Sequence, residues 1–337
     1  MFFCFKAICK QVLPTACVIF ISLATFAQVP KKNEAPIKFD DIRDNSWAGD
    51  FALIKIPSTA DGAIQNAYFY KSTSNKPRPL IISLHTWSGD YRQRDDLAPL
   101  CKQKNLNYIH PNFRGANKTS AACCSELALA DIDDAIGYAL KYGHVDTSKI
   151  YLIGVSGGGY VTLSVFMKSK HHIRKFSAWA SITDLEAWYC ESVIMKNKYA
   201  ADILACTESK DSSLDVNNAR LRSPMYMRTP TDKLNNAKLF IHVGVFDGIQ
   251  GSVPITHSLN FYNKLLNDLA VKDPAEYISE HERLQLLEHR RPLGQFGSIG
   301  GRRTCLRKQH GNLSLTVFEG EHEMLTRFAL DEILEDQ

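Results

Sequence analysis

The sequence lacks the patterns of several large protein classes. It has no C-x-x-C pair and no clustered cysteine–histidine spacing, so neither a zinc site nor any other metal or cofactor is expected. Its 40 lysines and arginines nearly balance its 36 aspartates and glutamates, so no nucleic-acid partner is expected. It also has no internal repeat, which argues against a repeat architecture. What remains is one 337-residue chain that is 45% hydrophobic, enough for a single sizeable core.

The N-terminal stretch has the pattern of an export signal. Two lysines precede a mainly apolar run over residues 12–26, and small residues that suit a signal peptidase end at Ala27. The pattern predicts a signal peptide over residues 1–27 and a polar leader over residues 28–50. A membrane anchor is the alternative, but the run is short for a span of about 20 residues. We therefore expect an exported protein, periplasmic or extracellular, with no membrane contact after cleavage.

Removal of this segment leaves six cysteines, an even number that permits disulfides in an exported chain. They are Cys101, Cys123, Cys124, Cys190, Cys206 and Cys305. The sequence does not fix their connectivity. We expect at least one disulfide, with Cys190–Cys206 as the first choice, because this bridge would close a short loop.

The central motif of the chain is a serine between a strand and a helix. Residues 150–153 form a continuous apolar run that predicts a buried strand, and helix-like apolar spacing begins at Tyr160. Between them lies G-x-S-x-G, residues 154–158, with Ser156 at its centre. Glycines are needed at such a turn because a neighbouring Cβ would clash with the strand and the helix. The arrangement predicts a nucleophile elbow with Ser156 as the nucleophile.

The rest of the chain alternates strands and helices, which predicts a mostly parallel, doubly wound α/β sheet in one domain over residues 51–337. Two insertions interrupt the alternation: a predicted helical cap over residues 185–233, and an arginine-rich stretch over residues 271–312 with a helix at 275–289. The expected strands are 51–56 and 63–70 (an antiparallel edge pair), 79–84, 107–111, 150–153, 176–181, 239–244 and 314–318.

A serine hydroxyl needs a base, and the base needs an acid that orients it. Asp247 and His322 each follow a predicted strand, at the edge where the carboxyl ends of parallel strands meet. We predict Asp247 as the acid and His322 as the base. Asp184 also follows a strand and is the rival acid.

The negative oxygen of a tetrahedral intermediate needs two N–H donors. One is expected from Gly157, directly after the serine. The other is expected from the loop after the strand at 79–84, with the Trp87 amide as the candidate and Thr86 as the rival. His85 is expected to hold this loop in place.

These motifs resemble the α/β-hydrolase superfamily: Ser156 in G-V-S-G-G, Asp247 in H-V-G-V-F-D-G and His322 in F-E-G-E-H-E. The resemblance covers about residues 79–334. The segment A-R-L-R-S-P, residues 219–224, also resembles the catalytic domain of the prolyl oligopeptidase family of serine peptidases. Two departures are an H-T-W oxyanion loop in place of the usual H-G, and only some fifty residues before the domain where that family has a β-propeller.

The resemblance implies a serine hydrolase that forms an acyl-enzyme on an amide or an ester. The leading expectation is a serine-type peptidase. A carboxylesterase for acetylated or feruloylated carbohydrate stays open, as does a non-catalytic binding protein of the same fold. The expected partner is therefore a small molecule, a peptide or a carbohydrate ester.

The arginine-rich insertion joins the segments that carry Asp247 and His322. If it folds over the catalytic edge, Arg302 or Arg303 could hold an acidic group of the substrate, because a guanidinium pairs with a carboxylate in a bidentate manner. A solvated basic surface is the alternative interpretation.

Overall fold

The computed structural model describes residue 40 and residues 44–335, and the statements below concern these residues. The expected signal peptide over residues 1–27 lies outside the described residues, as does most of the expected leader over residues 28–50. Among the helices of the described part, none is both long enough and apolar enough to span a bilayer.

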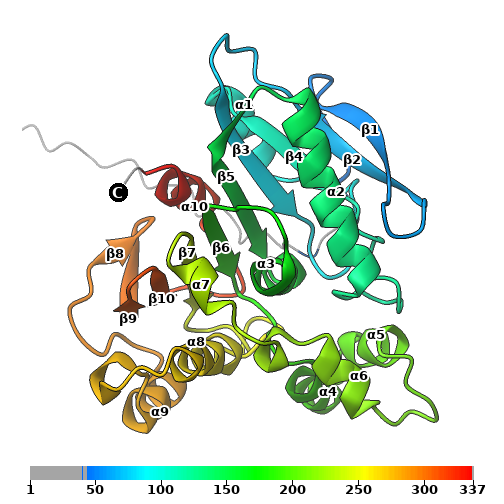
Figure 1. The fold of residues 1–337 in the computed structure, drawn as a ribbon. Coiled ribbons are helices and arrows are strands. Elements are labelled where there is room, and N and C mark those ends of the chain that lie inside the picture. The colour runs from blue at the N-terminus through cyan, green and yellow to red at the C-terminus, as the bar shows by residue number, and fades with distance from the viewer. Residues whose placement is uncertain (1–39, 41–43, 336–337) are drawn as a thin grey trace, which may run out of the picture. The chain divides into compact units, whose positions relative to one another are not determined.

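A ten-stranded mixed sheet runs through the molecule in the order β1-β2-β4-β3-β5-β6-β7-β10-β9-β8 (Figure 1). The six strands from β4 to β10 in that order are parallel, while the pairs at both edges are antiparallel. The mostly parallel sheet predicted from the sequence is confirmed. The strands are β1 Ala52–Pro57, β2 Ile64–Tyr70, β3 Arg78–Leu84, β4 Asn107–Pro111, β5 Val145–Val155, β6 Lys175–Trp179, β7 Lys238–Gly244, β8 Ser298–Ile299, β9 Arg302–His310 and β10 Leu313–Phe318.

Helices cover both faces of the sheet, as a doubly wound fold requires. Side chains of a central strand alternate between two apolar cores: Leu80 and Ile82 enter one and Ile81 the other. The first core is closed by α2 Glu126–Tyr142, α3 Gly157–Lys168 and α8 Thr256–Asp268. The second is closed by α1 Leu97–Gln103 and α10 Thr326–Leu334. Burial on both faces explains why the central strands are continuous apolar runs.

The stretch predicted as a cap is helical, and its first three helices lie beyond the carboxyl ends of the central strands (Figure 1). It contains α4 Leu185–Ile194, α5 Tyr199–Cys206, α6 Val216–Leu221, the 3-10 turn η1 Pro224–Tyr226 and α7 Thr231–Leu234. Trp188 anchors it to the loop after β7, because its Nε1 donates to the carbonyl of Ser252 at 2.7 Å.

The second insertion contains a strand that the sequence analysis missed. Its helical part is η2 Pro274–Glu276 and α9 Glu280–His289, but residues 302–310 form β9, antiparallel to β10. The basic residues of this strand interrupt the apolar pattern by which strands were predicted from the sequence. Thr304, Cys305 and Leu306 are buried, whereas the arginines on either side are exposed. An edge strand with charged, solvated positions gives no clear apolar alternation.

The cysteine chemistry differs from the expectation of a Cys190–Cys206 bridge. All six cysteines of the described part are thiols. Cys190 is exposed, whereas Cys206 is buried at the end of α5 with its Sγ 2.7 Å from the Sγ of Cys123. The reason is that α5 turns its last residue toward the loop before α2, a neighbour far away in sequence.

Candidate functional site

Ser156 lies in the sharp turn that the sequence predicts. Its backbone has φ 57° and ψ −121°, a strained conformation for a residue with a side chain, and α3 begins at the next residue. The glycines on either side permit close packing. A Cβ on Gly154 would lie 2.3 Å from the carbonyl oxygen of Gly158, and one on Gly158 would lie 2.3 Å from that of Leu84. Ser156 is thereby held at the carboxyl edge of the sheet, at the N-terminus of a helix.

Two backbone amides converge beside Ser156. A Cβ on Gly157 would lie 2.2 Å from the amide nitrogen of Trp87, so the two loops touch at this point. The Thr86 amide donates to Oε1 of Gln93 at 2.9 Å, whereas the Trp87 amide has no acceptor among the described residues. The geometry therefore favours Trp87 over Thr86 as the second oxyanion donor. His85 holds this loop, with Nε2 2.7 Å from the carbonyl oxygen of Asn112.

His322 and Asp247 form a hydrogen-bonded pair at the same edge. The two atoms His322 Nδ1 and Asp247 Oδ2 are 2.8 Å apart. The carboxylate is fully buried and its Oδ1 accepts hydrogen bonds from the amides of Gly248 at 2.9 Å and Val253 at 3.2 Å. Since β5, β7 and β10 lie close together in the parallel part of the sheet, their terminal loops bring Ser156, Asp247 and His322 to one edge.

The environment of His322 suits a general base. Its Nε2 is buried without a hydrogen-bond partner among the described residues, which leaves it free for a serine hydroxyl or a leaving group. Burial alone would lower the pKa of His322. The charge of Asp247 and its hydrogen bond, with a further contribution from the charge of Asp40, outweigh burial and raise the pKa.

The rival acid Asp184 has another role in the structure. It is the N-cap of α4, where its Oδ1 accepts hydrogen bonds from the amides of Glu186 and Ala187. Its Oδ2 accepts a hydrogen bond from the hydroxyl of Tyr226 at 2.9 Å. The geometry therefore favours Asp247 as the partner of His322.

Gly251 is a site residue that the sequence analysis missed. A Cβ at this position would lie 2.3 Å from Oδ1 of Asp247 and 2.3 Å from Cβ of His322. The loop after Asp247 thus crosses directly over the hydrogen-bonded pair and shields it. Only the absence of a side chain permits this approach, and no sequence motif announces it.

Arg302 and Arg303 do not present free guanidinium groups to a ligand, contrary to the expectation that they hold an acidic substrate. Arg302 Nη2 is 3.2 Å from Oε2 of Glu323, and Arg303 forms an ion pair with Glu319. The reason is the antiparallel pairing of β9 with β10, which places both arginines beside the acidic residues around His322. Their placement supports a role in holding the loop of residues 319–323.

Polar residues from distant parts of the chain surround Trp87. Its indole Nε1 donates to Oδ2 of Asp202 on α5 at 3.2 Å, and burial raises the pKa of that carboxyl. Asp40 accepts hydrogen bonds from the residues on either side of Trp87 and from Tyr199. Asp40, Tyr199 and Asp202 were not singled out from the sequence, because their hydrogen bonds here join residues more than 40 positions apart.

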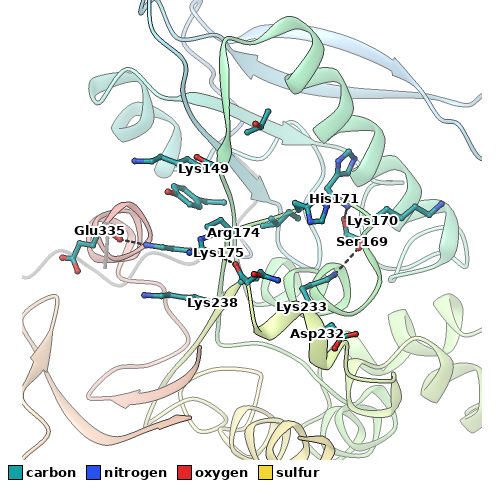
Figure 2. Close-up of a pocket in the computed structure, with 17 residues that line it drawn as sticks. Lys149, Ser169, Lys170, His171, Arg174, Lys175, Asp232, Lys233, Lys238 and Glu335 are labelled. Carbon is teal, nitrogen blue, oxygen red and sulfur yellow. Dashed lines mark hydrogen bonds between the residues drawn. The ribbon is translucent and has the colours of Figure 1, made fainter. Parts of the chain in front are cut away.

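A separate cavity of about 730 Å³ lies at the opposite edge of the sheet, near the starts of β6 and β7 (Figure 2). Its cationic lining is bonded to the protein itself. Lys233 Nζ donates to the carbonyls of Phe166 at 2.7 Å and Ser169 at 3.1 Å, and Arg174 donates to that of Asn236. None of the expected catalytic residues lines this cavity.

The described part of the chain contains no group of three or more His, Cys, Asp or Glu side chains arranged to hold a metal ion. The residues at the catalytic edge match the roles of nucleophile, base and orienting acid, with backbone amides as hydrogen-bond donors to an oxyanion.

Comparisons with known proteins show the family to which the chain belongs. The model of the prolyl oligopeptidase family matches residues 97–281, more than half of the chain, including Ser156 and Asp247. Acylamino-acid-releasing enzyme 1 of Oryza sativa subsp. japonica is 24% identical over 251 residues, which are 66% of this chain and 30% of that protein.

Two solved structures show the same fold. The acylaminoacyl peptidase of Pyrococcus horikoshii has a TM-score of 0.52 and 18% identity, over 65% of this chain and 35% of that one. A puromycin-hydrolyzing peptidase of Mycobacterium tuberculosis has a TM-score of 0.55 and 12% identity, over 84% of this chain and 37% of that one. The chain thus spans about a third of the length of these relatives. With an α/β-hydrolase fold and a family model matched over more than half of its residues, the chain belongs to the prolyl oligopeptidase family of serine hydrolases.

Proposed function

We propose that this protein is a peptidase that works through an acyl-enzyme, with Ser156 as the nucleophile, His322 as the base and Asp247 as the orienting acid. One observation carries the proposal. The Nδ1 of His322 is 2.8 Å from a buried carboxylate, while its Nε2 is buried and free of any described partner. A histidine bound in this way on one side is prepared to move a proton on the other.

Acylation follows from this arrangement. Asp247 keeps the proton of the neutral imidazole on Nδ1, so Nε2 is the basic nitrogen. His322 removes the hydroxyl proton as Oγ of Ser156 attacks the carbonyl carbon. The carbonyl oxygen becomes an oxyanion and accepts hydrogen bonds from the amides of Gly157 and Trp87. Because both amides are fixed by close loop packing, little reorganisation is needed in the transition state.

Breakdown of the first tetrahedral intermediate completes acylation. The imidazolium of His322 donates its proton to the leaving nitrogen, the C–N bond breaks, and the acyl group remains on Ser156. Deacylation uses the same groups. A water molecule then loses a proton to Nε2 of His322 and attacks the acyl carbon, which releases the acid and restores the serine hydroxyl.

The family membership and the names of the relatives support a peptide amide as the substrate. Two of the relatives reported above are named for the release of acylated amino acids. We propose an N-acylated aminoacyl amide as the first substrate to test. The chain covers only about a third of those proteins, so their specificity serves as a guide to the experiment.

A substrate panel tests the proposed reaction. The wild type and Ser156→Ala are assayed on acetyl-aminoacyl anilides, on anilides with a free amino terminus, and on acetylated and feruloylated sugars. We expect turnover of amides by the wild type and none by the variant. Turnover of the sugar esters alone would establish the carboxylesterase instead, and binding without any turnover would establish a non-catalytic protein.

We further propose that the protein is exported, on the pattern of residues 1–27. The test is expression of the full sequence followed by cell fractionation and N-terminal sequencing. We expect a mature chain that begins at Gln28 outside the cytoplasm. A chain that keeps its first residues in the cytoplasmic fraction would contradict export.

A further inference from the structure

The carboxylate of Asp40 is the centre of a hydrogen-bond cluster at the oxyanion loop. Its Oδ1 accepts from Oγ1 of Thr86 at 3.0 Å and from the amide of Ser88 at 2.9 Å. Its Oδ2 accepts from Oγ of Ser88 at 2.8 Å and from the hydroxyl of Tyr199 at 2.8 Å. The Nζ of Lys198 is 3.2 Å away. The Asp40 side chain is only 18% exposed, so these are its principal interactions.

Two of the partners of Asp40, Thr86 and Ser88, are the neighbours of Trp87 along the chain. Thr86 and Ser88 are both bound to one carboxylate, so the two peptide units between them cannot rotate freely. The first of these units carries the Trp87 amide, the proposed second oxyanion donor. An oxyanion donor stabilises the transition state only when its N–H is aimed at the developing charge. Asp40 therefore helps to fix the direction of the Trp87 N–H.

The same carboxylate also joins the loop to the cap. Tyr199 and Lys198 belong to the start of α5, and α5 carries Asp202, which accepts the indole N–H of Trp87. The backbone and the indole of Trp87 are thus held from two sides. Asp40 is the member of this cluster that contacts both the loop and the cap.

The charge of Asp40 also reaches the base. The charged groups of the cap that act on Asp40 are Lys198, whose Nζ is 3.2 Å away, and Asp202. The groups that act on His322 are Asp247, through a hydrogen bond, and Asp40, through space. A negative charge near the imidazole favours the imidazolium, which forms as Ser156 attacks.

We propose that Asp40 is a positioning residue of the catalytic site, which aims the Trp87 amide at the oxyanion. This inference rests on the proposed function, because it assigns a role within that site.

Two variants separate the role of Asp40 as a hydrogen-bond acceptor from the role of its negative charge. Asp40→Ala removes the acceptor and the charge, whereas Asp40→Asn keeps the shape and removes the charge. Asp44→Asn is the matched control, since it changes an exposed aspartate of the same segment that pairs with Arg94. Active sites are counted by complete fluorophosphonate labelling, so kcat refers to folded enzyme.

We expect Asp40→Ala to lower kcat about 10²-fold with little change in KM, the effect of losing one oxyanion donor. We expect Asp40→Asn to lower kcat less, and to move the acid limb of kcat/KM to lower pH. The sign follows from the charge. Without Asp40 the pKa of His322 falls, so the base stays deprotonated to a lower pH.

Two results would overturn the inference and can be told apart. If Asp40 variants match Asp44→Asn in kcat and in the pH profile, or lose only thermal stability, Asp40 has no positioning role although the proposed reaction stands. If the wild type itself neither turns over substrate nor labels at Ser156, the proposed function fails first and this inference fails with it.

Discussion

Gly251 offers a sharp test of the geometry because its replacement changes no chemical group of the site. In Gly251→Ala the new Cβ would start 2.3 Å from Oδ1 of Asp247 and 2.3 Å from Cβ of His322. Carbon atoms pack at about 3.5 Å, so the loop or the hydrogen-bonded pair must move by about 1 Å. We therefore predict a loss of catalysis without the loss of any catalytic group.

The magnitude follows from that displacement. A misplacement of 1 Å in a catalytic group costs about 10²-fold in rate, which corresponds to roughly 3 kcal/mol of transition-state stabilisation. The control is Gly137→Ala in α2, because a Cβ there meets no atom within 4 Å. Alanine is also the better helix former, so this variant should be as stable as the wild type or more so.

Two measurements check the prediction. Steady-state kinetics should show a fall of about 10²-fold in kcat/KM for Gly251→Ala and no change for Gly137→Ala. Proton NMR should show that the resonance of the histidine N–H bonded to Asp247 shifts or broadens in the first variant alone. Full activity together with an unchanged resonance in Gly251→Ala would refute the described packing of this loop.

The remaining predictions concern three other pairs of groups. Asp247→Asn should lower kcat by about 10⁴-fold, because the asparagine would hold the wrong histidine tautomer. Asp184→Asn should keep activity, because Asn caps a helix as well as Asp. A larger loss of kcat from Asp184→Asn would reverse the assignment. Oxidative refolding should join Cys123 to Cys206, since their sulfurs are 2.7 Å apart. The bridge would enclose 83 residues and stabilise the fold by roughly 4–5 kcal/mol in the chain-entropy model. Peptide mapping that finds both cysteines as thiols after refolding would exclude the bridge. Arg303→Ala should change KM for acidic and neutral substrates equally and by less than about twofold, because the guanidinium pairs with Glu319 of the protein itself and the pair is solvent-exposed. A rise in KM for acidic substrates alone would restore a ligand-binding role.

The parts of the site that could be predicted are those fixed by the ends of strands. Ser156, Asp247 and His322 each follow a buried strand, and parallel strands must bring their carboxyl ends to one edge. The buried strands themselves were readable because burial on both faces gives continuous apolar runs. The sequence therefore indicated the fold and the three groups without any knowledge of distances.

The parts that could not be predicted depend on contacts between distant segments. Asp40 lies in a polar leader, and its bond to Ser88 spans 48 residues with no periodic pattern to announce it. Gly251 differs from an ordinary loop glycine only in its close contact with Asp247 and His322, which the sequence does not show. β9 was missed because its exposed face carries charge, and the resulting ion pairs of Arg302 and Arg303 were missed with it.

The most direct test of the account is the identity of the residue that reacts with a fluorophosphonate. The reagent phosphonylates only an activated serine, with loss of fluoride, and the native protein is digested and mapped by mass spectrometry after labelling. We predict a single modified residue, Ser156, with no label on Ser156→Ala or on the denatured chain, and normal labelling of Ser148→Ala, which alters an exposed serine bound to Asp146. Label on another serine, or equal labelling of native and denatured protein, would contradict the proposed catalytic site.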